Sequence, residues 1–155
     1  MFKCIHNIPA GPSTSDIGEW TMMWDVKQPI DSRGKWCALL SNKVNNDADA
    51  DLFISTNFLL GVGWSYGGSF PAETWCRVVA VMNAPASSYR VYLNEVCVID
   101  AKDGVDSRFW SYYMHPLHTW ICGDDNGDNH PVHLSTAAIF DRALSEEEIS
   151  SLGGL

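Results

Sequence analysis

Hydrophobic and polar positions alternate along most of this chain with a period of two. In residues 19–27 every second position is Trp, Met or Val, whereas the positions between them carry Thr, Met, Asp and Lys. Successive side chains of a β-strand point to opposite faces, so this pattern predicts a strand with one strongly apolar face. Residues 74–83 are apolar on both faces apart from Arg77, which predicts a central strand packed between two layers.

Further short alternating runs are separated by Gly, Pro, Asn, Asp and Ser, which are the residues that turns require. A hairpin turn is expected at Thr56-Asn57, because Asn tolerates a positive φ. Helix signals occur at the C-terminus, where Ser145 and Glu148 have the form of a capping box and Gly153 is placed to end the helix. The pattern therefore predicts an all-β fold of two stacked antiparallel sheets with one short C-terminal helix.

Composition supports a single domain over residues 1–155. Hydrophobic residues make up 46% of the chain and charged residues 19%, so one apolar core is expected rather than a disordered acidic chain. The net charge of -9 comes from 19 acidic and 10 basic residues, which are too few and too scattered for the basic stripe of a nucleic-acid-binding protein. We expect no nucleic-acid partner, and no membrane span, since no run approaches about 18 apolar residues.

Five cysteines, at positions 4, 37, 76, 97 and 122, form no C-x-x-C pair. Most lie within apolar runs, where a cysteine acts as a small hydrophobic residue. Buried thiols are therefore expected, and one structural disulfide is the alternative for an exported protein.

Most of the chain resembles laminin-G-like domains of the concanavalin A-like lectin/glucanase superfamily. Their closing signature is similar to A-I-F-D-R-A-L-S-E-E-E-I at residues 138–149, and their central strand pair resembles residues 75–81 followed by Y-R-V-Y-L-N at 89–94. The resemblance implies a jelly-roll sandwich. Residues 49–54 and 124–129 are also similar to motifs of such domains in larger secreted or surface proteins of bacteria.

The resemblance implies a non-catalytic carbohydrate-binding module of a larger exported bacterial protein, secreted or at the cell surface, with neighbouring domains as further partners. The opening residues Met1-Phe2-Lys3-Cys4 contain no hydrophobic signal core, so we expect them to begin a domain cut from that protein. One alternative is a structural or protein-interaction module that supports a neighbouring catalytic domain. A glycoside hydrolase is a remote alternative, because the E-x-D-x-x-E spacing of the superfamily's glucanases does not occur.

Aromatic residues are the candidates for sugar binding. Seven Trp, five Tyr and six Phe make up 12% of the chain, and the apolar face of a pyranose stacks on an aromatic ring. Four tryptophans in apolar alternating runs are expected in the core: Trp20, Trp24, Trp36 and Trp75. Rings flanked by Gly, Ser or other aromatic residues are the predicted ligand-binding residues: Trp64, Tyr66, Trp110, Tyr112 and Tyr113. The alternative for these five is that they plug the open ends of the sandwich.

Two acidic segments, residues 45–51 and 124–128, are candidates for a calcium ion, which takes six to eight oxygen ligands. The predicted metal ligands are Asp49, Asp51, Asp124 and Asp128. Calcium would fix the loops and would take no part in catalysis. The alternative for both segments is a solvated turn, because Asn, Asp and Gly are turn residues.

Overall fold

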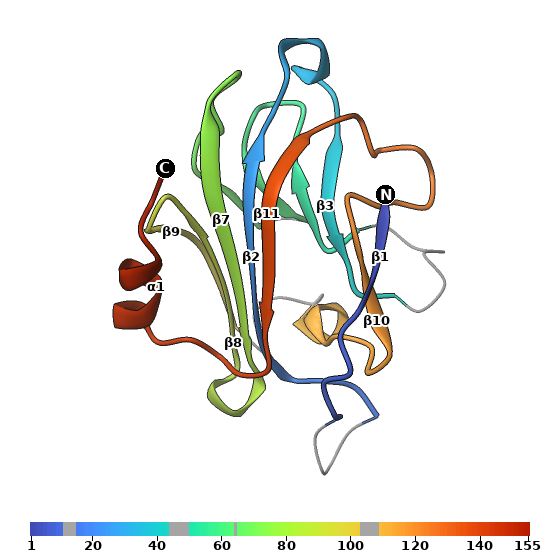
Figure 1. The fold of residues 1–155 in the computed structure, drawn as a ribbon, viewed down its shortest axis with the longest axis vertical. Coiled ribbons are helices and arrows are strands. Elements are labelled where there is room, and N and C mark those ends of the chain that lie inside the picture. Colours follow the sequence, from blue (N-terminus) through green and yellow to red (C-terminus); the bar gives the residue numbers. More distant parts are fainter. Residues whose placement is uncertain (11–14, 44–49, 64, 103–108) are drawn as a thin grey trace.

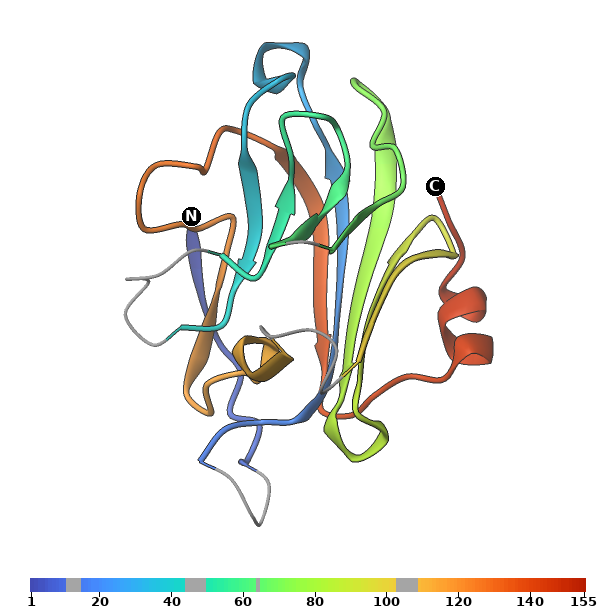
Figure 2. The ribbon, with the colours of Figure 1, turned by 180° about the vertical axis from the view of Figure 1, so that it is seen from behind.

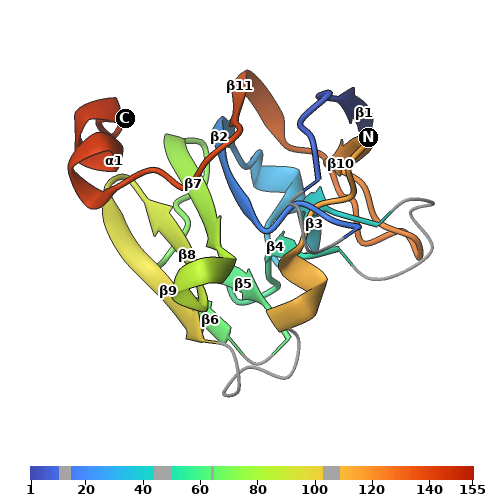
Figure 3. The ribbon, with the colours of Figure 1, turned by 90° about the horizontal axis from the view of Figure 1, so that it is seen from below.

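The chain folds into two antiparallel β-sheets that stack face to face (Figures 1 and 3). The computed structural model describes residues 1–10, 15–43, 50–63, 65–102 and 109–155. Within these ranges the strands form a jelly-roll sandwich with one short C-terminal α-helix. The predicted fold class is therefore confirmed.

The six-stranded sheet has the order β1-β10-β3-β4-β5-β6, and Figure 2 shows β3 to β6 from behind, coloured cyan to green. Its strands are β1 (Phe2–Ile5), β3 (Cys37–Ser41), β4 (Leu52–Ile54), β5 (Leu60–Val62), β6 (Ser65–Gly67) and β10 (His118–Ile121). The five-stranded sheet has the order β11-β2-β7-β8-β9. Its strands are β2 (Glu19–Lys27), β7 (Trp75–Asn83), β8 (Ser88–Leu93), β9 (Val96–Lys102) and β11 (His133–Phe140).

Four short helices accompany the sheets in the described part of the chain. They are the 3-10 helices η1 (Ile30–Ser32), η2 (Ala84–Ala86) and η3 (Phe109–Tyr112), and the α-helix α1 (Glu146–Leu152). None of the helices in the described ranges has the length and apolar character needed to span a bilayer.

The two strands with the clearest sequence patterns lie at the centre of the five-stranded sheet. On β2, Trp20 and Trp24 are completely buried in the core between the sheets, as the alternation predicts. On β7, Val78 faces this core, whereas its neighbour Val79 faces the other side and packs in a second cluster with Ile149 of α1. Strand β7 is therefore buried on both faces over residues 78–82, as predicted, whereas Trp75 at its start is exposed.

Helix α1 has the predicted caps. Ser145 Oγ accepts a hydrogen bond from Glu148 N at 3.3 Å, and the Glu148 carboxylate accepts one from Ser145 N at 2.9 Å. Gly153 ends the helix with a φ of 73°, in the left-handed region that favours glycine. Arg142 also binds the Glu148 carboxylate and holds its pKa down at about 2. These local contacts fix the helix where Ile149 reaches the sheet.

The turn between β4 and β5 differs from the prediction. The left-handed backbone conformation falls on Phe58, with a φ of 67°, rather than on Asn57. Tertiary contacts hold Phe58 in this conformation, because the Arg33 guanidinium lies 3.4 Å from its ring centroid and Phe70 N donates to its carbonyl at 2.7 Å. The prediction used only the tolerance of Asn for a positive φ, and this local preference does not reveal contacts with residues far away in the chain.

All five cysteines are free thiols. The expectation of burial is confirmed for Cys37 and Cys76 but is wrong for Cys97, which is exposed on β9. Burial raises the pKa of the Cys122 thiol to about 11, so this group stays protonated at neutral pH.

Candidate functional site

Tyr112, a predicted ligand-binding residue, lies in the core. Its side chain is completely buried, and its ring stacks on Tyr89 with the centroids 4.0 Å apart and the planes 12° from parallel. Its carbonyl accepts a hydrogen bond from Trp20 Nε1 at 3.1 Å. Tyr112 therefore offers no ring to a ligand in this structure. It belongs to the hydrophobic core between the sheets, which agrees with the alternative that these rings fill the sandwich.

The neighbouring candidates give less support to a binding surface. The ring of Tyr113 is half-buried and lies edge-on to Phe109, with the centroids 6.5 Å apart. A Cβ atom at Gly18 would come within 2.9 Å of the Tyr113 ring, so Tyr113 also packs against the end of the sandwich. Trp64 lies outside the described residues, and so does the side chain of Trp110, whose backbone belongs to η3.

Tyr66 is the predicted aromatic residue that does lie on an outer surface of the sandwich. Its ring packs against Trp36 at 6.0 Å between centroids, and Trp36 meets Phe53 edge-on at 5.6 Å. Trp36 packs with Ala38, Ala50 and Phe53 in a cluster separate from the core between the sheets, and Tyr66 adjoins this cluster through Trp36. We call these five residues the outer aromatic face. Trp36 and Tyr66 are both half-buried rather than enclosed in the core.

Strand register explains how the outer aromatic face forms. Ala38 of β3 pairs with Phe53 of β4, Phe53 pairs with Gly61 of β5, and Gly61 pairs with Tyr66 of β6, so these residues share one face. Gly61 is required here, because a Cβ atom at this position would lie 2.5 Å from Tyr66 Cδ1. The Tyr66 ring therefore lies across Gly61 toward the middle of the sheet.

The prediction that Trp36 belongs to the core between the sheets is wrong. Trp36 directly precedes Cys37, whose side chain faces that core, and consecutive residues of an extended chain face opposite ways. Residues 36–39 alternate between the outer face, with Trp36 and Ala38, and the core, with Cys37 and Leu39. All four residues are apolar, so the sequence does not reveal which of the two faces points to the core.

A further tryptophan lies on the same outer side of the six-stranded sheet. Trp120 of β10 precedes Ile121, which belongs to the core, so the Trp120 side chain points outward. The Lys3 ammonium is 5.3 Å from its ring centroid, and the ring of His118 meets it edge-on at 5.5 Å. Trp120 is half-buried. Aromatic rings thus occur from β10 to β6 across this side of the sheet.

The second acidic segment lies against the outer aromatic face. Asp124 Oδ1 accepts a hydrogen bond from Ala50 N at 3.0 Å, and its Oδ2 accepts from Asn126 N and Asp128 N at 3.2 Å each. The Asp128 carbonyl accepts from Ala38 N at 2.9 Å. Because Ala38 and Ala50 belong to the outer aromatic face, this loop is held at its border.

The two predicted calcium segments meet at Ala50. Asp51 is completely buried, and its Oδ2 accepts a hydrogen bond from Asn42 N at 2.8 Å. The carboxylates of Asp51 and Asp124 thus both accept backbone N–H groups, as carboxylates do in ordered turns. Among the residues that the structure describes, no three His, Cys, Asp or Glu side chains form a group that could hold a metal ion. Asp49 lies outside the described residues, and the calcium site stays a prediction.

The fold of this protein is a jelly-roll sandwich of two antiparallel sheets. No family model matches the sequence, and no curated protein matches it. Solved structures do match in fold. The CBM40 module of a Ruminococcus gnavus IT-sialidase, bound to α2,3 sialyllactose, is 12% identical with a TM-score of 0.64, over 91% of this chain and 85% of that chain.

Two other kinds of protein share the fold. A Trypanosoma rangeli sialidase in complex with the inhibitor DANA is 15% identical, with a TM-score of 0.64 over 97% of this chain. This chain spans 28% of that sialidase chain, so the likeness concerns one part of a larger protein. A heptameric SAP-like pentraxin from Limulus polyphemus is 12% identical, with a TM-score of 0.53 over 97% of this chain and 80% of that chain. At such identities the likeness shows the fold alone.

Proposed function

We propose that this chain is a carbohydrate-binding module and that it binds its glycan on the outer aromatic face. The observation that carries this proposal is the pair of half-buried rings, Trp36 and Tyr66, on the outside of the six-stranded sheet. A pyranose can stack on such rings, while the backbone and side chains of the adjoining Asp124 loop bind its hydroxyls. The structural likeness to a module that was solved with sialyllactose supports a glycan ligand.

We propose that the module is non-catalytic. Glycoside hydrolysis in most families needs two carboxyl groups that reach the scissile bond from either side. Two carboxylates that lie beside the outer aromatic face, those of Asp51 and Asp124, are buried and accept backbone N–H groups. They support the shape of the loops, and neither is placed to donate a proton to a sugar.

The resemblance to laminin-G-like domains belongs to the same proposal. Its signature at residues 138–149 covers the end of β11 and the capped start of α1. A module of this kind would work within a larger exported bacterial protein, secreted or at the cell surface, and would place its neighbouring domains near the glycan.

A glycan array tests the proposal, with plant, host and microbial glycans and with calcium present or chelated. The variants Trp36→Ala and Tyr66→Leu remove a ring from the outer aromatic face, and we expect each to weaken binding about tenfold. Tyr66→Phe keeps the ring and should keep most of the affinity. Val96→Ala, at a 65% exposed position on β9 of the other sheet, is the matched control.

Melting curves of each variant separate lost binding from lost folding. Array signals that persist in a folded Trp36→Ala and a folded Tyr66→Leu protein would place the glycan elsewhere. No signal from the unmodified protein on any glycan would contradict carbohydrate binding and favour the structural or protein-interaction module instead.

A further inference from the structure

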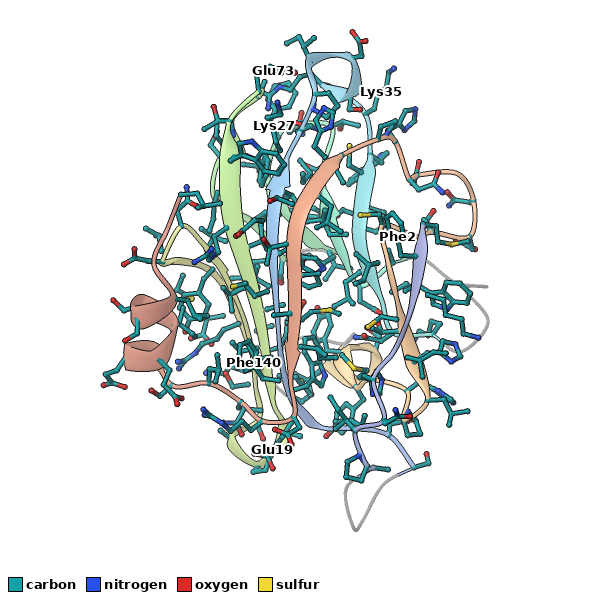
Figure 4. The ribbon with its side chains drawn as sticks, in the orientation of Figure 1. Phe2, Glu19, Lys27, Lys35, Glu73 and Phe140 are labelled. Carbon is teal, nitrogen blue, oxygen red and sulfur yellow. The ribbon has the colours of Figure 1, made fainter. Side chains whose placement is uncertain are left out.

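The outer face of the five-stranded sheet carries an exposed tryptophan. Trp75 of β7 was expected in the core, yet it is 38% exposed. Its neighbour Cys76 faces the core, and consecutive residues of a strand face opposite ways, so Trp75 points outward. Helix α1 covers another part of this face, where Phe140 packs against the helix cluster. Figure 4 labels Phe140 at the opposite end of the sandwich from Lys27 and Glu73. The end of the face that carries Trp75 lies outside this apolar cluster.

Lys27 contacts the Trp75 ring, and two further polar side chains, Glu73 and His133, adjoin Lys27. Lys27 of β2 pairs with Trp75, and its ammonium lies 5.6 Å from the ring centroid. His133 of β11 pairs with Lys27 on its other side. The Glu73 carboxylate lies 3.8 Å from the Lys27 ammonium. Hydrogen-bond donors and an acceptor therefore gather around Lys27, whose ammonium lies over the exposed Trp75 ring.

Glu73 is held in an unusual backbone conformation. Its φ of 54° lies in the left-handed region, which is uncommon for a residue with a long side chain. Its N–H donates to the Gln28 carbonyl at 2.9 Å, and its Oε1 accepts from Ile30 N. These bonds fix the carboxylate beside Lys27. Strained residues of this kind concentrate at ligand sites and turns.

We propose that Trp75, Lys27, Glu73 and His133 form a second carbohydrate-binding site, which takes a neutral pyranose. The sugar stacks its apolar face on the Trp75 ring, and the polar side chains bind its hydroxyls. The Lys27–Glu73 ion pair balances its own charge, so it offers hydrogen bonds without a net attraction for an anionic sugar. This second site shares with the proposed function only the premise that the module binds glycans, since it lies on the opposite sheet.

Two-dimensional ¹H–¹⁵N NMR of the indole N–H groups tests the site, since each of the seven tryptophans gives its own signal. The Trp75 signal is assigned as the one missing from the Trp75→Tyr protein. The probes are neutral hexasaccharides of β-1,4-, β-1,3- and α-1,4-linked glucose, with 3′-sialyllactose as the anionic comparison. We expect a neutral probe to shift the Trp75 signal, Trp75→Ala to weaken this binding about tenfold, and Trp75→Tyr to retain it. Val96→Ala should bind like the unmodified protein.

The outcomes separate the two sites. If probes shift only other indole signals, and Trp75→Ala binds them unchanged, the second site is wrong while the outer aromatic face stands. If 3′-sialyllactose alone shifts the Trp75 signal, the assignment of a neutral sugar is wrong. If no probe shifts any signal and the array is silent, both proposals fail.

Discussion

At the scale of the single residue, Glu95 adopts a backbone conformation that lowers the stability of the fold. Asn94 and Glu95 form the turn between β8 and β9 with φ values of 46° and 72°, as a two-residue hairpin turn of the primed type requires. Asn tolerates the left-handed region, but the Cβ atom of Glu costs roughly 1–2 kcal/mol there. We predict that Glu95→Gly raises the free energy of unfolding by about 1 kcal/mol, or about 2–4 °C in Tm, as measured by thermal melting.

Glu95→Ala is the control, because it removes the carboxylate but keeps the Cβ atom. It should leave Tm nearly unchanged, whereas an equal rise in both variants would attribute the gain to charge rather than to backbone strain.

Side-chain alternation predicted the buried Trp20 and Trp24 correctly, because both lie in a long run with one clear period. Trp36 and Trp75 lie at the starts of their apolar runs. The core side of each strand begins with the next residue, Cys37 or Cys76, so each Trp ring points to the outer face. Tyr112 is buried by its stack with Tyr89, a contact between distant parts of the chain that no local pattern reveals. Of the predicted rings that the structure describes, Tyr66 lies on an outer surface, Tyr112 lies in the core and Tyr113 packs against Phe109, and their role in binding stays a prediction.

At the scale of elements, the fold was predictable where local signals agree with packing, as in β2, β7 and the capped helix α1. The outer aromatic face was harder to predict from the sequence, because it depends on the register of four short strands around Gly61. Each of β4, β5 and β6 has three residues, too few to show a period. Their pairing is set by the sheet as a whole.

The edge of the six-stranded sheet has a contact that depends on protonation. His6, which follows β1, donates from Nε2 to the His115 carbonyl at 3.1 Å and accepts at Nδ1 from Ile8 N at 3.1 Å. Only the neutral imidazole with its proton on Nε2 makes both bonds. Burial lowers the pKa of His6 from its ordinary 6.5 and outweighs the hydrogen bond to the His115 carbonyl, which raises it, while the nearby His118 and His115 lower it further when charged.

We therefore predict that His6 makes the protein less stable in mild acid. The unfolded chain binds the proton first, so the contribution of His6 is present above pH 6.5 and is lost as the pH falls toward the lowered pKa of the folded state. Urea unfolding between pH 7.5 and 5.5 measures this loss. His6→Asn keeps an acceptor at the δ position but does not titrate, so it should lose less stability over this range.

His133→Asn, at an exposed position on β11, is the control and should follow the unmodified protein. Parallel pH profiles for the unmodified and His6→Asn proteins would assign the acid sensitivity to other groups.

At the scale of the whole molecule, the Asp124 loop joins segments that are far apart in the chain. Its carboxylate links β10 to the start of β4 through Ala50, 74 residues away in sequence. If calcium binds the native loops, it stabilises the entire fold, because the unfolded chain has no such site. We predict that calcium at a hundredfold excess over Kd adds about 2.7 kcal/mol, on the order of 5–10 °C in Tm, and that a chelator reverses the shift.

Asp124→Asn distinguishes a metal ligand from a turn residue. The amide keeps the oxygen that accepts from Ala50 N but replaces the oxygen that accepts from Asn126 N and Asp128 N, so the metal-free Tm should fall. The lost charge should also abolish the response to calcium, and this response is the measurement that separates the two roles. Magnesium, which prefers a smaller and more rigid octahedral site, should give a weaker shift in the unmodified protein. Identical melting of the unmodified protein in calcium and in chelator would show that the acidic segments act only as turns. The Asp124 loop also borders the outer aromatic face. If this loop binds no calcium, the affinity of that face for a glycan should be the same in calcium and in chelator.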